Sequence, residues 1–154
     1  MPKRKTHQSI GALTGAGAAL VAARDQQPPH QVIEVLAAGI SGWYSSLIPD
    51  IIDPAMSPNH RSIGHGAVQG IAGLKVALDK IPSAQGQLRA QAQEFAQRRQ
   101  HVRPGGEDPW PIWCLEAAEL LCRMLSGVLI GLVAGYGSHL VLDARTPRGL
   151  PLLA

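Results

Sequence analysis

The longest apolar segment of the chain, residues 112–142, reads IWCLEAAELLCRMLSGVLIGLVAGYGSHLVL. Its acidic and basic residues lie near its start, and from Met124 to Leu142 the only group that can carry a charge is His139. An apolar stretch of this length is about long enough to cross a bilayer as a helix. A buried core helix of a soluble bundle has the same pattern, so both interpretations stay open. In either case the segment predicts one long helix.

Working outward from this segment, the apolar and helix-forming patterns predict further helices near residues 8–23, 31–47, 61–79 and 84–100, with the last helix over 112–143. Prolines and glycines separate them, at Pro28-Pro29, Pro49, Pro82 and Pro104-Gly105-Gly106. No segment alternates with the period of two that is typical of strands. We therefore predict an all-α fold, a bundle of about five helices that is either membrane-embedded or soluble. The chain is expected to form a single domain over residues 1–154, with a polar helical insert near 83–108.

The start of the chain is basic, with Lys-Arg-Lys at residues 3–5, and an apolar run follows at residues 10–23. A basic start before an apolar run resembles a signal peptide. Because His7 and Gln8 interrupt the pattern, we predict a retained first helix with Thr6 as its N-cap. If the chain spans a membrane, the basic start is expected on the cytoplasmic side.

The composition, together with the basic start, suggests membrane association. Only 16% of the residues are charged and 45% are hydrophobic, whereas about a quarter of the residues of a soluble domain are charged. Glycine and alanine are abundant, and small residues let helices approach closely in membranes. We predict a protein of the inner (cytoplasmic) membrane, or one associated with it, with the cytoplasm as the alternative.

Charge and cysteine usage exclude other classes. The formal charge is +3, and no basic stripe is interleaved with aromatic residues, so no nucleic-acid partner is expected. Cys114 and Cys122 are the two cysteines. On one helix they lie about 12 Å apart along the axis, too far to form a disulfide. Buried free thiols are the preferred interpretation over metal ligands.

Polar residues gather in a proline-rich turn, residues 47–65, which reads LIPDIIDPAMSPNHRSIGH. It holds two carboxylates, two imidazoles and a guanidinium, on Asp50, Asp53, His60, Arg61 and His65. Carboxylate and imidazole are the oxygen and nitrogen ligands of divalent metals such as zinc. We interpret the turn as one half of a metal site.

The second half is predicted at the end of the chain, where His139 and Asp143 are spaced four apart. On a helix this spacing places both side chains on one face, one turn apart. The pair can chelate one ion, or Asp143 can orient the ring of His139. An ordinary hydrogen-bonded helical pair has the same spacing. Two such clusters in a chain with few charges favour function, because ionisable groups in apolar surroundings tend to be functional.

Three motifs carry a family resemblance: Pro-Asp-Ile-Ile-Asp-Pro at 49–54, His-Arg-x-x-x-His at 60–65, and GYGSHLVLDARTPRGLPL at 135–152. Together they resemble the YdjM-like family of membrane-bound, metal-dependent hydrolases. That family is similar in ligand order to zinc-dependent phospholipases C. Carried over residue by residue, the resemblance implies that the metal ligands are His7, Asp50, His65, His139 and Asp143.

The expected function is metal-dependent hydrolysis of a small-molecule or lipid phosphoester, with one or two divalent ions, zinc first among them, activating water. Asp53 is the candidate to accept a proton from that water or to bridge two ions. Arg61 and Arg145 are candidates to clamp the phosphate, because guanidinium matches its oxygens in bidentate fashion. His60 is the reserve ligand for His65, since spacing alone does not choose between them.

Two alternatives remain open from the sequence. In one, the chain is a non-catalytic helical membrane or interaction protein whose polar clusters only tie helix ends together. In the other, it is a metal-binding module without turnover.

Overall fold

The computed structural model describes residues 4–52, 67–102 and 110–144, and every described element of regular structure is a helix. The elements are α1 (Arg4–Ala22), α2 (Pro28–Ser45), α3 (Ile48–Ile52), α4 (Ala67–His101) and α5 (Ile112–Ala144). The predicted all-α fold is confirmed. Four long helices pack together, and α3 is a short fifth element of 5 residues.

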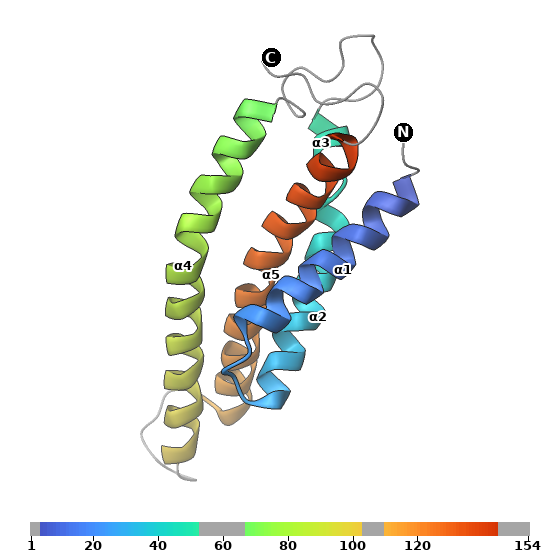
Figure 1. The fold of residues 1–154 in the computed structure, drawn as a ribbon. Coiled ribbons are helices and arrows are strands. Elements are labelled where there is room, and N and C mark those ends of the chain that lie inside the picture. Colours follow the sequence, from blue (N-terminus) through green and yellow to red (C-terminus); the bar gives the residue numbers. More distant parts are fainter. Residues whose placement is uncertain (1–3, 53–66, 103–109, 145–154) are drawn as a thin grey trace.

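In the view of Figure 1 the helices run alternately down and up. α1, α2 and α5 pack against one another, and α4 packs along α5. Because α1 descends while α2 and α5 ascend, the start of α1, the short α3 and the end of α5 all lie at one end of the bundle (Figure 1). Residues far apart in the sequence therefore meet at that end.

Small residues allow the backbones of α2 and α5 to approach closely. Gly127, Gly131 and Gly135 recur every four residues along the face of α5 that packs on α2. A Cβ atom at Gly131 would overlap the carbonyl oxygen of Ala38 and the hydroxyl of Ser41. Such small-residue stripes are typical of helix pairs in membranes, where packing rather than the hydrophobic effect holds helices together.

We expect Gly131→Ala to lower the free energy of unfolding by about 1–3 kcal/mol, because the added methyl group forces two backbones apart. Gly86→Ala in α4 is the matched control, since a Cβ there meets nothing within 4 Å. That control is expected to be neutral or to stabilise by up to about 1 kcal/mol. Melting temperatures in one detergent would compare the two. Equal stabilities would show that the helices do not depend on this close contact.

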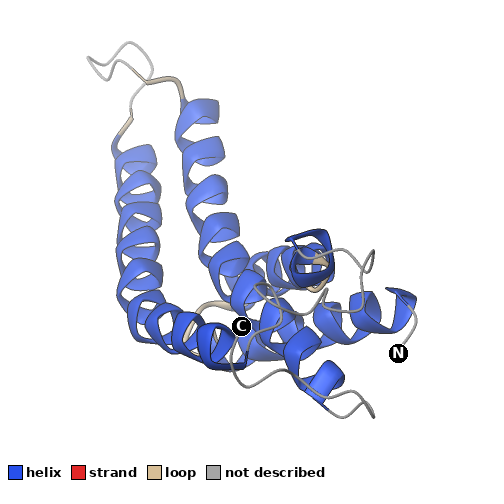
Figure 2. Cartoon of the chain, turned by 90° about the horizontal axis from the view of Figure 1, so that it is seen from above, coloured by secondary structure: helices blue, strands red, loops and turns tan. Residues whose placement is uncertain are grey.

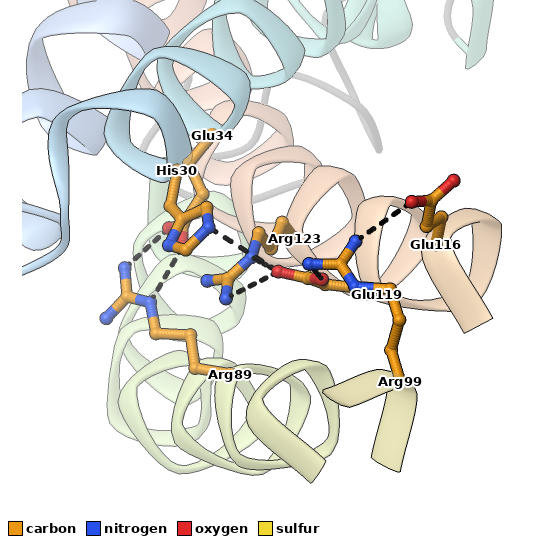
Figure 3. Close-up of polar contacts among 7 residues, drawn as sticks. All are labelled: His30, Glu34, Arg89, Arg99, Glu116, Glu119 and Arg123. Carbon is orange, nitrogen blue, oxygen red and sulfur yellow. Dashed lines mark hydrogen bonds and ion pairs between the residues drawn. The ribbon is translucent and has the colours of Figure 1, made fainter. Parts of the chain in front are cut away.

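A buried ion pair fastens α4 to the other helices. Arg89 donates hydrogen bonds from Nε and Nη2 to the two carboxylate oxygens of Glu34, at 2.9 and 2.6 Å, as Figure 3 shows. The hydroxyl of Ser126 donates to the same carboxylate at 3.0 Å. The predicted polar helix near 84–100 therefore covers a neighbour, with a charged side chain as its anchor.

Several predicted boundaries were wrong. Two helices were predicted near 61–79 and 84–100, with Pro82 between them. In the structure they are one helix, α4, and Pro82 lies inside it. A proline within a helix bends it when the lost hydrogen bond can be tolerated, and α4 is bent in Figure 2. Thr6 is not an N-cap, since it lies within α1. The helix predicted near 31–47 begins earlier, because Pro28 and Pro29 occupy the first turn of α2, where their missing N–H groups cost nothing.

Two described segments are long and apolar enough to cross a membrane, as judged by length and composition: Pro28–Ile51 and Ile112–Ala144. Large apolar side chains on both segments point away from the bundle, among them Leu36, Ile40, Leu121 and Val141. Hydrocarbon around the bundle would suit such a surface.

Both cysteines are free thiols, as predicted, with Cys122 buried and Cys114 half-buried.

Candidate metal centre

His7, His139 and Asp143 meet at the end of the bundle where α1 begins and α5 ends. Each offers one ligand atom, and these atoms lie within 4.8 Å of one another. His7 Nε2 is 3.7 Å from one oxygen of Asp143, and His139 Nε2 is 3.5 Å from the other. All three residues are buried. The cluster thus joins two residues near the end of the chain to one near its start.

The two imidazole rings are held side by side. Their centroids are 4.0 Å apart and the ring planes differ by 24°. The backbone of α1 fixes His7, and the last turns of α5 place His139 and Asp143 on one face, as their spacing predicted. Both rings therefore present Nε2 to the same carboxylate.

Asp50 approaches the cluster from α3. One of its carboxylate oxygens is 3.6 Å from His139 Nε2, and its side chain is 52% exposed, in contrast to the buried side chains of the other three residues. The group thus combines three buried residues with one carboxylate that is accessible to solvent.

The backbone carbonyl of Ser46 selects the tautomer of His139. His139 Nδ1 hydrogen-bonds to this oxygen, which is an acceptor only, so Nδ1 must carry the proton. Nε2, which faces the carboxylates of Asp50 and Asp143, then keeps its lone pair when the ring is neutral. Metal-binding histidines commonly have their other ring nitrogen fixed in this way.

The spacing of these atoms fits a shared divalent ion. Ligands at about 2.0–2.2 Å in a tetrahedral arrangement lie about 3.4 Å from one another. The closest pairs of Nε2 and carboxylate oxygen lie 3.5–3.7 Å apart, and single ligand atoms from His7, His139 and Asp143 lie within 4.8 Å of one another. Two imidazoles and carboxylates are also a ligand set found in zinc sites. The residues present therefore suit a zinc-type ion, with their side chains drawing closer together around it.

The remaining predicted site residues lie outside the described residues. They are Asp53, His60, Arg61 and His65 in the segment after α3, and Arg145 directly after α5. Their predicted roles stay predictions. Of the predicted metal ligands, the described part of the chain brings together His7, Asp50, His139 and Asp143.

Sequence reasoning missed Ser46, the residue that orients His139. It contributes a backbone carbonyl at the C-terminal end of α2. Carbonyls in the last turn of a helix lack intrahelical partners and are free to accept from a side chain. Any residue type supplies that oxygen, so no signal in the sequence could have identified it.

Comparison with known proteins adds to the geometry. No curated protein and no solved structure matches the chain. A family model described as YdjM inner membrane protein matches it over residues 1–154. This description and the two candidate spanning segments locate the protein in the inner membrane, as its composition predicted. The chain belongs to the YdjM inner membrane protein family.

Proposed function

We propose that the protein is a metal-dependent hydrolase of phosphoesters, acting at the membrane surface on a small-molecule or lipid substrate. The observation that carries the proposal is the buried group of His7, His139 and Asp143, with Asp50 at its edge. These residues would hold a divalent ion, zinc first among the candidates. The ion would supply hydroxide at neutral pH, because it lowers the pKa of bound water towards about 7.

The protein's own residues prepare this chemistry. His139 is held in the tautomer that keeps the proton on Nδ1 and the lone pair on Nε2, and Asp143 presents one oxygen to each imidazole. His7, His139 and Asp143 are buried, whereas Asp50 is accessible to solvent. A substrate that reached the ion would meet a preorganised group, which lowers the cost of reaching the reacting geometry.

Basic residues at the same end favour an anionic substrate. Arg4 and Lys5 are exposed in the first turn of α1, and Arg4 lies one turn before His7. Arg61 and Arg145 would add guanidinium groups that bind phosphate oxygens in bidentate fashion. Asp53 would accept a proton from the attacking water or bridge a second ion, and His65, with His60 in reserve, would complete the ligand set.

Metal analysis of the purified protein, combined with an activity assay, tests the proposal. We expect stoichiometric zinc and slow hydrolysis of the model substrate bis(p-nitrophenyl) phosphate. A chelator should abolish this hydrolysis, and added zinc should restore it. Protein without metal above background would favour a non-catalytic protein whose polar groups only connect helix ends. Stoichiometric metal without hydrolysis of any phosphoester tried would favour a metal-binding module.

A further inference from the structure

A second polar site lies towards the end of the bundle opposite the candidate metal centre of His7, His139 and Asp143, called the metal cluster below. A cavity of about 450 Å³ opens where the turn between α1 and α2 meets α4 and α5. Its lining is almost wholly polar: five glutamines, two arginines, a histidine and two acids, with Ala96 as the one apolar residue. Arg123 lies 16 residues before His139 on α5, which is about 24 Å along a helix. The cavity is therefore separate from the metal cluster.

Basic side chains from three helices converge on Glu119 in this cavity (Figure 3). Arg123 donates from Nε and Nη2 to one oxygen of Glu119, at 3.2 and 3.1 Å. Arg99 Nη2 lies 3.5 Å from the other oxygen, and His30 Nε2 lies 3.4 Å from the first. One carboxylate is thus surrounded by two guanidinium groups and an imidazole.

The buried charges of the lining are Arg123 and Glu119, which offset each other. Arg99 adds a positive charge at a half-buried position, where it lies 3.5 Å from Glu119 and 3.4 Å from the exposed carboxylate of Glu116. The second acid of the lining, Asp25, has a side chain that is 85% exposed and lies 3.6 Å from Arg24. Water screens an exposed pair of this kind, so Asp25 contributes little to the charge of the cavity.

Arg123 also has unused hydrogen-bonding capacity. Its side chain is 3% exposed, and its Nη1 group is buried without a hydrogen-bond partner. A buried donor without an acceptor is costly, more so when it is charged. Ionisable groups inside membrane segments are retained mainly for function. An acceptor-rich, negatively charged ligand would satisfy Nη1 of this guanidinium group.

We propose that this cavity binds a phosphate group, either on a free phosphate compound or on a lipid headgroup. Arg99 and Arg123 would hold its oxygens, since planar guanidinium groups are suited to phosphate. Side-chain amides of Gln93 and Gln97, from the neighbouring face of α4, would add neutral donors. The cavity exceeds the size of a bare phosphate ion, which leaves room for the rest of a polar molecule. The site is independent of the proposed hydrolysis.

Thermal stability with two phosphate sources tests this site. The protein is first studied in detergent, stripped of metal by a chelator, with inorganic phosphate or chloride at equal ionic strength. It is then studied in the same phosphate-free detergent with and without added phosphatidylglycerol. Phosphate well above its Kd should raise the melting temperature by about 3 °C or more. A rise with inorganic phosphate indicates a free ligand, and a rise only with phosphatidylglycerol indicates a headgroup.

Variants locate the binding. Gln97→Glu places a negative charge on the lining of the cavity at an exposed position, and it should abolish the rise while the protein stays folded. Gln87→Glu makes the same change on an exposed part of α4 outside the cavity, and it should keep the rise. His139→Ala should also keep it, because the metal cluster is not involved. Arg123→Gln should lose it.

The proposal is overturned if neither phosphate source stabilises the wild-type protein. It is equally overturned if Gln97→Glu keeps the full rise, or if His139→Ala loses it, since the phosphate would then bind elsewhere. If Arg123→Gln fails to fold, Gln97→Glu still decides the test, because Gln97 takes no part in the ion pairs around Glu119. None of these outcomes depends on hydrolysis.

Discussion

His139→Ala is expected to leave the purified protein without stoichiometric metal while its helical circular dichroism stays largely intact. The imidazole of His139 is fully buried, and its Nε2 lies 3.5 and 3.6 Å from the carboxylates of Asp143 and Asp50. Loss of a residue that only supports a ligand lowers metal affinity by about 10–100-fold. Loss of the central ligand should exceed that range, so the ion would be lost during purification. Elemental analysis by mass spectrometry measures the effect.

A second histidine provides the matched control. His101 is exposed at the end of α4, and His101→Ala removes the same side chain far from the cluster. This variant should keep its full metal content. Retention of full metal content by His139→Ala would show that the ion binds elsewhere. Loss of metal from both variants would indicate that purification, not the substitution, removes it.

Glu34→Ala is expected to lower the free energy of unfolding by about 3–5 kcal/mol, the usual cost of leaving one partner of a buried ion pair alone. Glu34 is fully buried, and its removal leaves the Arg89 guanidinium and the Ser126 hydroxyl without their acceptor. Unfolding by denaturant in a fixed detergent measures the change. Because Arg89 anchors α4, we also expect faster proteolysis of α4 in this variant.

An exposed ion pair within α4 provides the comparison for the buried pair of Glu34 and Arg89. Lys75 Nζ lies 2.8 Å from Asp79, with side chains 75% and 61% exposed. Asp79→Ala should cost at most about 1 kcal/mol, because water screens the pair. If Glu34→Ala is no more destabilising than Asp79→Ala, the buried pair does not anchor α4. Replacing both Glu34 and Arg89 by leucine should recover much of the loss, since apolar packing can substitute for a buried pair.

The structural differences from prediction have local physical causes. Pro82 was expected to end a helix, but packing of α4 along α5 outweighs one lost hydrogen bond, and the helix bends. Pro28 and Pro29 lie in the first turn of a helix and not before it, because proline is well suited to that turn. A proline in the sequence therefore does not show by itself whether a helix ends, begins or bends there.

The amino-acid sequence by itself determined the helical class, because apolar runs without period-two alternation leave helices as the way to satisfy the backbone. It also determined the local pair of His139 and Asp143, since spacing on one helix fixes their common face. Glycine and alanine indicated close helix packing, and the family motifs indicated which histidines and aspartates to follow.

Only the tertiary structure decided which of these residues meet. His7 and His139 are 132 positions apart in the sequence, and no local preference brings their rings to a centroid distance of 4.0 Å. Their contact requires α1 and α5 to run in opposite directions, and the glycine stripe of α5 sets how closely the helices pack. The Ser46 carbonyl and the cavity around Glu119 and Arg123 likewise arise from helix packing. Long-range contacts of this kind depend on the register between helices, which the periodicity of a single helix does not encode.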